Sequence, residues 1–256
     1  MGEKKTIKCL VWDLDNTLWD GTLLEGDDVR LREGVVDVIH ELDNRGILLS
    51  IASKNDPEDA LEALSSSGLA EYFLVPQIGW GPKSESIAEL ARVLNIGLDT
   101  FAFIDDQPAE RAEVVFHHPE VRVYDASEYL SLPDLPEFTP RFITPDSKLR
   151  RKMYQDDLKR REVEEQFGGN SEAFLRSLNM KLTLSRVKEG DLERVEELTL
   201  RTNQLNSTGA TYDYEELLSF MNSENHVFLI ADLTDKFGDY GKIGLALAER
   251  SEQALT

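Results

Sequence analysis

The sequence has little cysteine and little histidine, and both shortages restrict the chemistry it can perform. A single cysteine, Cys9, stands among 256 residues, so the chain cannot close an internal disulfide and has no cysteine cluster for zinc. The four histidines show no spacing typical of metal ligands. Because disulfide-free chains are typical of reducing compartments, we expect a cytoplasmic protein.

Long apolar runs and positive charge are also scarce. No run approaches the roughly 20 apolar residues that a membrane-spanning helix needs, so a membrane protein is not expected. Lys and Arg number 28 against 49 Asp and Glu, which gives a formal net charge of −21. Nucleic acid phosphates and anionic lipid repel such an acidic chain, and the sequence therefore predicts neither as a partner.

The composition is that of a globular protein of one or two domains, with 41% hydrophobic and 30% charged residues. The first half alternates short apolar runs with segments of helical period. Strands are expected at 7–12, 47–52, 72–75, 101–104 and 121–124, and helices at 35–45, 57–67, 84–94 and 109–116. Such alternation is typical of the α/β class, in which helices cover both faces of a parallel sheet.

The pattern changes after residue 130. Residues 131–147 contain four of the nine prolines, which predicts a linker wrapping the first domain. A charged helix is expected at 148–167, followed by strands at 180–184, 227–231 and 243–248 and helices at 191–202 and 214–222. We therefore predict a catalytic domain at 1–130, a Pro-rich linker with charged helices at 131–178 and an α+β segment at 179–256.

Acidic side chains follow two of the apolar strands at the points where these strands end. Asp13 and Asp15 come directly after the first strand, and Asp105 and Asp106 end the fourth. Because the carboxyl ends of parallel strands meet at one edge of the sheet, we expect these carboxylates to lie together. Buried carboxylates require a cation, and Mg²⁺ prefers carboxylate and carbonyl oxygens. The spacing thus favours a Mg²⁺ site.

Two further groups reach the same edge: the Ser53 hydroxyl at the end of the second strand and the Lys83 ammonium in a loop before a helix. An Asp after a strand often caps a helix, and one Asp-x-Asp triplet is common by chance. Four such elements in this order on successive strands favour the catalytic interpretation over capping.

This set resembles the haloacid dehalogenase (HAD) superfamily of phosphohydrolases and phosphotransferases. The matching residues are Asp13-Leu14-Asp15-Asn16-Thr17, Ser53, Lys83 and Asp105-Asp106. The resemblance implies a Rossmann-like parallel sheet with a minimal cap, and covalent phosphoryl transfer. It makes Asp13 the nucleophile on phosphorus and Asp15 the acid that protonates the leaving oxygen and later activates water.

The resemblance also implies which residues hold the metal and the substrate. It assigns Mg²⁺ to the Asp13 carboxylate, the Asp15 backbone carbonyl and Asp105, with Asp106 close or acting through water. It places the transferring phosphoryl oxygens on Ser53 and Lys83. Four neighbours of these motifs are expected to line the substrate: Asn16, Thr17, Lys54 and Asn55.

Longer stretches resemble one family within this superfamily, the FkbH-like proteins. These stretches are Lys8–Trp12, Leu18–Gly21, Ser50–Asp56, Phe103–Pro108 and Arg201–Asn206. The resemblance implies a role in polyketide biosynthesis. Members of the family take 1,3-bisphosphoglycerate, a small phosphorylated three-carbon substrate, and remove phosphate. They load a glyceryl group as a thioester onto the phosphopantetheine arm of an acyl carrier protein.

The short inserts between the motifs agree with a substrate that arrives on another protein. Some 35 residues separate the first motif from the second, and the stretch from Ser53 to Lys83 is also short. Neither can fold into a large cap domain, so the site is expected to be open. Two other interpretations remain: a HAD phosphatase acting on a free small phosphorylated metabolite, and a catalytically silent carrier-protein docking module.

Two features leave alternatives open. Residues 179–256 resemble the start of a GNAT-like acyltransferase fold but lack its glycine-rich cofactor signature, so we assign no acetyl-CoA site. Gly241 and Gly244 are expected to be turn residues.

Cys9 is a candidate acyl acceptor. However, it lies four residues before Asp13, roughly 13 Å upstream in a strand that leads away from the catalytic edge, and a buried cysteine is usually inert.

A basic run between Lys148 and Arg161 has two interpretations. It is either a docking patch for an acidic carrier protein or a solvated helix whose cations pair with acids one turn away, such as Asp157 with Arg161. We favour the internal pairs.

Overall fold

The computed structural model describes residues 5–26, 28–201 and 209–250, with the backbone alone at Arg201. The chain divides into two compact units, one formed by Met1–Ile143 and Ser147–Tyr154 and the other by Thr144–Asp146 and Gln155–Thr256. Most of the predicted linker therefore belongs to the first unit. The reason is apolar burial, since Leu132 and Phe138 are fully buried in the core of that unit.

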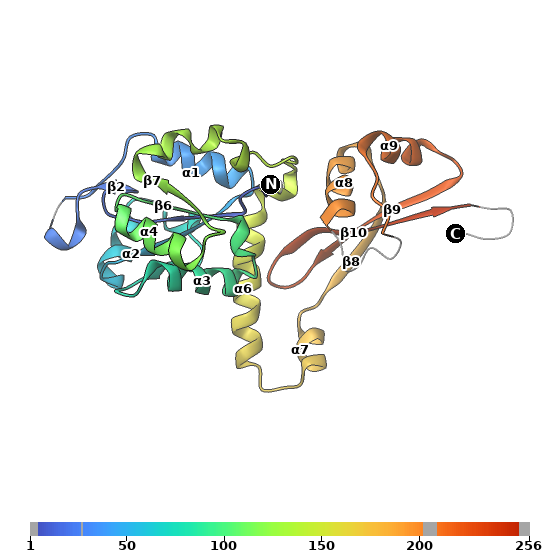
Figure 1. Cartoon of the computed structure of the whole chain (residues 1–256). Helices are drawn as coiled ribbons and strands as arrows, with labels where there is room; N and C mark the ends of the chain where they lie inside the picture. The colour runs from blue at the N-terminus through green and yellow to red at the C-terminus, as the bar shows by residue number, and fades with distance from the viewer. Residues whose placement is uncertain (1–4, 27, 202–208, 251–256) are drawn as a thin grey trace. The chain divides into compact units, whose positions relative to one another are not determined.

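The first unit contains a five-stranded sheet in the order β5-β4-β1-β6-β7 (Figure 1). Its strands are β1 (Cys9–Trp12), β4 (Leu48–Ser53), β5 (Gln77–Ile78), β6 (Phe101–Asp105) and β7 (Arg122–Asp125). All neighbouring strands in this sheet run parallel, which confirms the α/β class predicted from the alternating pattern.

The strand predicted at 72–75 is wrong. Residues Ala70–Tyr72 form a short 3₁₀ helix, η2, and β5 begins only at Gln77. Val75 adopts a φ of 49°, a left-handed conformation that a strand does not tolerate, so the apolar run turns before the strand starts. Phe73 keeps one isolated bridge to Leu49.

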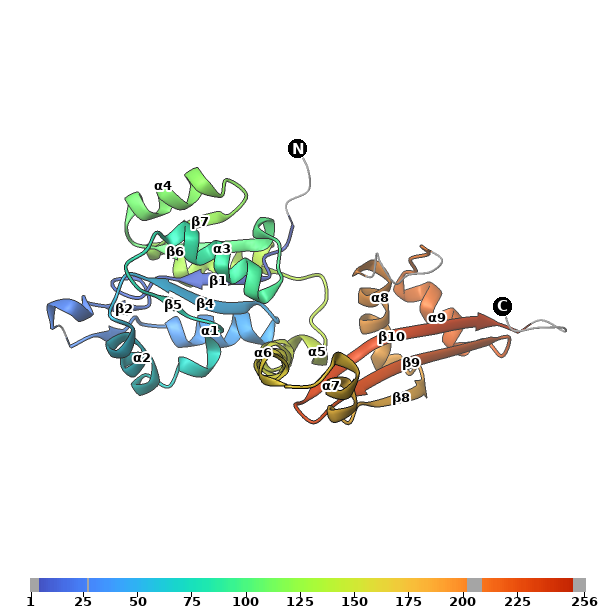
Figure 2. The same cartoon turned by 90° about the horizontal axis from the view of Figure 1, so that it is seen from below.

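Helices cover the sheet on both faces (Figure 2). Helices α1 (Val35–Asn44) and α2 (Pro57–Ser66) pack on one face, and α3 (Lys83–Leu94) and α4 (Pro108–His117) pack on the other. Side chains of β1 alternate between the two cores: Leu10 and Trp12 lie with α1 and α2, and Cys9 and Val11 lie with α3 and α4. Burial on both faces explains why this strand is a continuous apolar run.

Local signals in the sequence set the ends of these helices. The Asp56 side chain accepts hydrogen bonds from the backbone N–H groups of Glu58 at 2.9 Å and Asp59 at 3.3 Å, which caps α2. Beyond α1, Gly46 has a φ of 74°, and a Cβ there would lie 2.7 Å from the Ser147 carbonyl oxygen. Only glycine fits this chain reversal without strain.

Short elements complete the first unit. A hairpin of β2 (Trp19–Asp20) and β3 (Arg30–Leu31) follows β1 and carries the 3₁₀ turn η1 (Leu23–Glu25). The 3₁₀ helices η3 (Leu98–Thr100), η4 (Ala126–Asp134) and η5 (Pro136–Phe138) lie before β6 and after β7. Between β1 and α1, the described residues form only this hairpin and its 3₁₀ turn.

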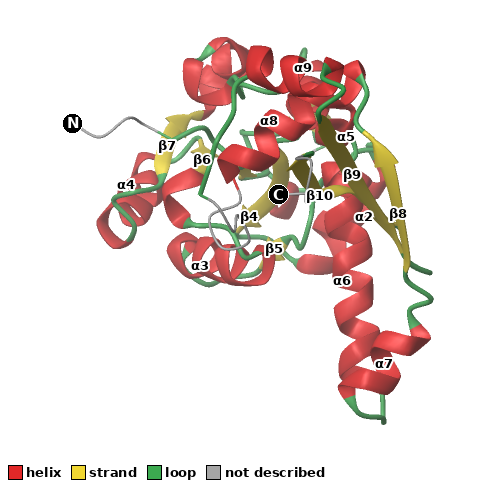
Figure 3. Ribbon diagram, turned by 90° about the vertical axis from the view of Figure 1, so that its right-hand side faces the viewer, coloured by secondary structure: helices red, strands yellow, loops and turns green. Residues whose placement is uncertain are grey.

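The second unit is an antiparallel sheet packed on helices. Its strands β8 (Lys181–Arg186), β9 (His226–Thr234) and β10 (Asp239–Glu249) have the order β10-β9-β8 (Figure 3). Its longer segment begins within the helix α6 (Arg150–Gln166), and the helical elements that follow are α7 (Ser171–Ser177), η6 (Glu189–Asp191), α8 (Leu192–Arg201) and α9 (Tyr214–Asn222). A small apolar core joins this sheet to α8 and α9, and it includes Leu192, Leu217 and Phe228.

Two predictions about this half of the chain need comment. Gly241 and Gly244 are strand residues rather than turn residues: both lie in β10 beside irregularities of its pairing, and the turn precedes them at 235–238. The left-handed φ of 69° at Gly241 produces the local kink. In the resembling stretch Arg201–Asn206, residues 202–206 lie outside the described residues.

The charged helix predicted at 148–167 is observed as α5 (Pro145–Lys148) and α6 (Arg150–Gln166). Its cations pair with acids: Arg151 with Asp43 at 2.9 Å, and Arg161 with Asp157 at 2.6 Å. Only the second of these pairs lies within the helix, so internal pairing one turn away is confirmed for Arg161, whereas Arg151 pairs with an acid of α1. Across residues 5–26, 28–201 and 209–250, no helix combines the length and apolar character that crossing a membrane requires.

Candidate functional site

The Lys83 ammonium is the centre of a buried polar cluster at the carboxyl edge of the parallel sheet. Lys83 is the first residue of α3, and its side chain is 2% exposed. Its Nζ donates to Asp13 Oδ1 at 2.5 Å, to the Ala52 carbonyl oxygen at 2.7 Å and to Asp105 Oδ2 at 3.2 Å. Glu110 Oε2 lies 3.1 Å from the same nitrogen. Residues at the ends of three neighbouring strands of the sheet, β4, β1 and β6, and one residue of helix α4 therefore contact the same cation.

Three carboxyl groups converge beside this lysine, as the strand-end argument predicts. Oxygens of Asp13, Asp105 and Asp106 all lie within 4.8 Å of one another. Burial raises the pKa of Asp13. Burial and the charge of Asp13 raise the pKa of Asp105 to about 7, although Lys83 opposes this change. A divalent cation would relieve this repulsion, and oxygen donors suit Mg²⁺, so the residues present fit that ion.

The Asp15 carboxylate faces donors from three places in the chain. Its Oδ1 accepts from Trp19 Nε1 at 2.8 Å and from the Leu23 backbone N–H at 3.3 Å, and its Oδ2 accepts from Asn55 Nδ2 at 3.0 Å. The carboxylate is thus directed by the hairpin and by the end of β4. The metal contact that the sequence analysis assigned to Asp15 involves its backbone carbonyl, which these side-chain contacts leave available.

The other predicted residues lie around this cluster. Ser53, at the end of β4, is buried. Thr17 Oγ1 accepts from the Asp106 backbone N–H at 3.1 Å, which ties the first motif to the loop after β6. Asn16 has a φ of 54°, and its side chain accepts from the Gly21 N–H at 3.2 Å in the turn of the hairpin. Lys54 is exposed and pairs with Glu110 at 2.8 Å.

Sequence reasoning missed Glu110. This residue lies in the first turn of α4, where its carboxylate bridges Lys54 and Lys83. Burial opposes its ionisation, but the two lysines outweigh that effect and lower the pKa of Glu110. Glu110 could have been predicted from its position five residues after Asp105. The helix that follows β6 begins at the edge of the sheet where the acids lie, so residues in its first turn are close to them.

Cys9, the candidate acyl acceptor of the sequence, lies away from the cluster around Lys83. Cys9 is 0% exposed in β1 and packs in the core between the sheet and helices α3 and α4. Burial raises the pKa of its thiol, so the nucleophilic thiolate is strongly disfavoured. A carrier-bound acyl group has no access to a side chain in this position.

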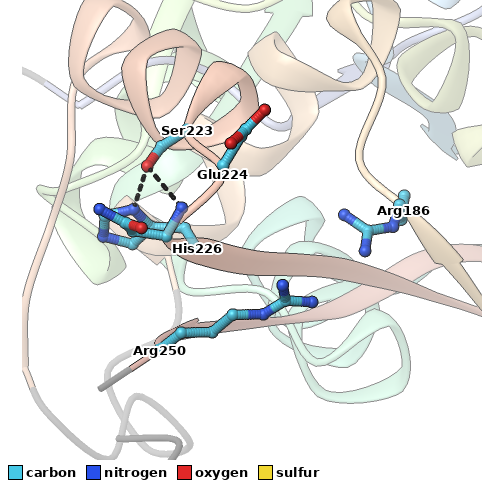
Figure 4. Close-up of a pocket in the computed structure, with 6 residues that line it drawn as sticks. Arg186, Ser223, Glu224, His226 and Arg250 are labelled. Atoms are coloured by element: carbon cyan, nitrogen blue, oxygen red, sulfur yellow. Dashed lines mark hydrogen bonds between the residues drawn. The ribbon is translucent and has the colours of Figure 1, made fainter. Parts of the chain in front are cut away.

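The second unit has a surface hollow of a different kind (Figure 4). It is lined by Arg186, Ser223, Glu224, Asn225, His226 and Arg250. Ser223 Oγ accepts from the Asn225 N–H at 3.2 Å and lies 2.8 Å from His226 Nδ1. These contacts order the turn before β9, and the hollow holds no pair of carboxylates comparable to the cluster around Lys83.

The chain is similar to solved structures of phosphatases over about half its length. One is the N-terminal part of a Bacteroides fragilis protein containing a phosphatase domain, complexed with Mg: it is 33% identical, the match covers 50% of this chain and 39% of that one, and the TM-score is 0.43. This chain therefore spans well under two thirds of that protein.

Two further structures are similar to part of the chain. A 3-deoxy-D-manno-octulosonate 8-phosphate phosphatase from Moraxella catarrhalis, in complex with a magnesium ion, a phosphate ion and a KDO molecule, is 24% identical. The match covers 40% of this chain and 59% of that one, with a TM-score of 0.32. A HAD-superfamily hydrolase from Geobacter sulfurreducens is 13% identical over 50% of this chain and 100% of that one, with a TM-score of 0.40. No family model and no curated protein matches the chain.

Proposed function

We propose that the first unit is a Mg²⁺-dependent phosphatase of the HAD type and that Asp13 is its nucleophile. The observation that carries this proposal is the buried Lys83 ammonium, 2.5 Å from Asp13 Oδ1 and 3.2 Å from Asp105 Oδ2. Phosphoryl transfer requires an in-line nucleophile and positive charge near the equatorial phosphoryl oxygens. Asp13 and Lys83 provide both at the edge of the sheet.

The side chains support a two-step reaction. In the first step, a carboxylate oxygen of Asp13 bonds to phosphorus while the bond from phosphorus to the leaving oxygen breaks, and Asp15 gives that oxygen its proton. In the second step, Asp15 takes a proton from water, the water oxygen bonds to phosphorus, and the bond between phosphorus and Asp13 breaks. Phosphate is released and both carboxyl groups return to their initial state.

Each residue around the reacting atoms has a part that its contacts explain. Trp19 and Asn55 orient the Asp15 carboxylate through hydrogen bonds of 2.8 and 3.0 Å. The cluster of Asp13, Asp105 and Asp106 would hold Mg²⁺, which when bound supplies positive charge that offsets the charge of the phosphoryl group. Ser53 is expected to donate a hydrogen bond to a phosphoryl oxygen from the end of β4.

The narrower proposal concerns the substrate, and the resemblance to FkbH-like proteins supports it. On this proposal the enzyme converts 1,3-bisphosphoglycerate into a glyceryl thioester on an acyl carrier protein. Glyceryl carries no phosphate, so both phosphates must leave. The carrier thiol sulfur bonds to the acyl carbon as the bond to the acyl phosphate oxygen breaks, and the phosphoester at the other end is hydrolysed. The small β2–β3 hairpin is compatible with a bulky, protein-bound substrate.

Intact-protein mass spectrometry tests both proposals together. The full chain is incubated with Mg²⁺, fresh 1,3-bisphosphoglycerate and a phosphopantetheinylated carrier protein, and released phosphate is measured in parallel. We expect a glyceryl-sized mass gain on the carrier and phosphate release. Asp13→Asn should lose the glyceryl-sized gain and the phosphate that comes from the phosphoester, because that phosphate leaves through Asp13. Asp20→Asn is the matched control, because the Asp20 side chain is 75% exposed in the hairpin.

The outcomes separate the candidate functions. Phosphate release that needs Asp13, without a mass gain on the carrier, would leave a phosphatase that acts on a free small metabolite. The absence of both phosphate release and mass gain would contradict the phosphatase proposal and favour a docking module without catalysis. Equal phosphate release by wild type and Asp13→Asn would contradict the assignment of the nucleophile.

A further inference from the structure

Helix α3 begins at the catalytic lysine without a cap of its own. The residue before the helix is Pro82, which makes no capping hydrogen bond, and Lys83 is the first helical residue. The first backbone N–H groups of a helix have no partner inside the helix and need an acceptor from elsewhere. The position of the Lys83 ammonium therefore depends on how the first turn of α3 is held.

A side chain from another helix supplies the missing cap. The backbone N–H of Ser84 donates to Glu113 Oε2 at 3.1 Å, and the Ser84 hydroxyl donates to Glu113 Oε1. Ser84 is only 4% exposed, so water cannot readily replace this acceptor. A carboxylate at this place also interacts favourably with the positive end of the helix dipole. In addition, His118 Nε2 lies 3.1 Å from the Ser84 carbonyl oxygen.

Glu113 and Glu110 lie three residues apart on α4, so they project from the same face of that helix. Glu110 contacts the Lys83 ammonium at 3.1 Å, and Glu113 binds the backbone one residue further along. Helix α4 therefore holds the catalytic lysine at both ends: at its charged tip and at the start of its helix. Asp105 ends β6 and Asp106 follows it in the loop before α4, so the acids and α4 are joined by a short stretch of chain.

We propose that Glu113 is a positioning residue that fixes the first turn of α3 and so keeps the Lys83 ammonium between Asp13 and Asp105. This inference rests on the proposed phosphatase function for its catalytic consequence and on the contacts above for its structural one. Without the Glu113 carboxylate, the buried N–H and hydroxyl of Ser84 lose their acceptor and the first turn of α3 frays. A displacement of about 1 Å at a catalytic group costs roughly a hundredfold in rate.

The structural consequence is measured without any activity. Trace labelling of lysines with acetic anhydride, followed by peptide mass spectrometry, compares the buried Lys83 with Lys159, whose side chain is 63% exposed. We expect Glu113→Ala to raise the ratio of Lys83 to Lys159 labelling about tenfold, because the fraying exposes the lysine. Glu113→Gln keeps an oxygen acceptor for Ser84 and is expected to restore protection. An unchanged ratio in Glu113→Ala overturns the proposal.

Two control variants separate positioning from general destabilisation. Glu85→Ala removes an exposed acid from the same first turn of α3, and it should leave Lys83 protected. Leu90→Ala weakens the buried face of α3 without touching Ser84. If Leu90→Ala raises Lys83 labelling as much as Glu113→Ala at equal loss of melting temperature, the effect is general and the positioning role is wrong.

The catalytic consequence is measured by a double-mutant cycle. We expect Glu113→Ala to lower kcat for phosphate release ten- to a hundredfold and Glu113→Gln to stay close to wild type. In a Lys83→Met background, Glu113→Ala should cost nothing further, because its effect passes through the lysine. Fully additive losses overturn the positioning role. Failure of the proposed function is seen separately, as absent phosphate release by the wild-type chain, and the labelling result still decides the proposal then.

Discussion

Asn55 Nδ2 donates a hydrogen bond to Asp15 Oδ2 over 3.0 Å and so joins the end of β4 to the loop after β1. The other carboxylate oxygen of Asp15 accepts from Trp19 Nε1 at 2.8 Å. With the Leu23 backbone N–H, which also donates to Oδ1, three neutral donors hold the proposed general acid. Asn55 was expected to line the substrate, whereas its amide nitrogen donates to Asp15.

Replacing Asn55 tests whether this orientation matters. A hydrogen bond to a charged group contributes about 1.5–3 kcal/mol, and 1.4 kcal/mol corresponds to a tenfold change in rate. We therefore expect Asn55→Ala to lower kcat for phosphate release at least about tenfold, with a smaller change in KM. Steady-state kinetics measures the change, and Asn222→Ala, at the exposed end of α9, is the matched control. An unchanged kcat would mean that Trp19 and the Leu23 N–H direct Asp15 without Asn55.

The raised pKa of Asp105 predicts how Mg²⁺ binding depends on pH. In the metal-free fold, burial and the charge of Asp13 raise this pKa to about 7. Mg²⁺ must replace the proton on Asp105, so its apparent affinity is expected to rise up to tenfold per pH unit below about pH 7 and to level off above it. Titration calorimetry at several pH values between about 5 and 8 measures this dependence.

The same shift has a consequence for stability. Because the folded pKa of Asp105 lies above its unfolded value, the metal-free fold binds the proton more tightly and loses that stabilisation as pH rises from about 4 to about 7. Mg²⁺ should therefore raise the melting temperature most above pH 7, and Asp105→Asn should remove most of this gain. Asp20→Asn should keep it. A Mg²⁺ effect of equal size at pH 5 and pH 8 would contradict the assignment of Asp105 to the metal.

The burial of Cys9 predicts a thiol that does not react in the folded protein. Because Cys9 is the single cysteine of the chain, the count of reacting thiols is unambiguous. We expect a disulfide reagent such as Ellman's reagent to modify almost none of the native protein within minutes and one thiol per chain after denaturation. Fast reaction of the native protein would reopen the acyl-acceptor role. Cys9→Ala is expected to leave phosphate release unchanged.

Much of the first unit could be predicted because its sequence signals are local. The strands β1, β4 and β6 are buried on both faces and are therefore continuous apolar runs. Such runs predict buried strands without knowledge of the tertiary structure. The convergence of Asp13 and Asp105 followed from topology alone, since both end parallel strands. The start of α2 at Pro57 was also predicted, because proline suits the first turn of a helix.

The missed features depend on partners that are distant in sequence. Glu110 and Glu113 lie on a charged helix face, a pattern that equally indicates exposure to solvent, and their roles require Lys83 and Ser84, at least 27 residues away. The left-handed turn at Val75 displaced a strand that propensity placed at 72–75. The hairpin strands β2 and β3 have two residues each, too few for any alternation to be recognised.

An acidic side chain in the second unit predicts the behaviour of the protein at low pH. Asp235 has a fully buried side chain that accepts from Arg160 Nε at 2.8 Å, from the Tyr240 hydroxyl at 2.9 Å and from the Phe237 N–H at 2.8 Å. Burial opposes its ionisation, but these donors outweigh that effect and lower the pKa of Asp235 to about 2. The ionised form therefore stabilises the fold.

The sign and window of the effect follow from this shift. An unfolded aspartate titrates near pH 3.9, so the carboxylate contributes about 2 kcal/mol that is complete above that pH and is lost as pH falls from about 4 to about 2. Hydrogen exchange of the β9 backbone, followed by mass spectrometry, reports on this unit. We expect the protection of the β9 amides, measured as the observed exchange rate relative to the intrinsic rate at each pH, to fall across that window in wild type. Asp235→Asn should exchange faster already at pH 7 and change less on acidification, and Glu215→Gln, at an exposed site on α9, should behave as wild type. Parallel pH profiles of Asp235→Asn and wild type would show that other carboxylates dominate the acid response.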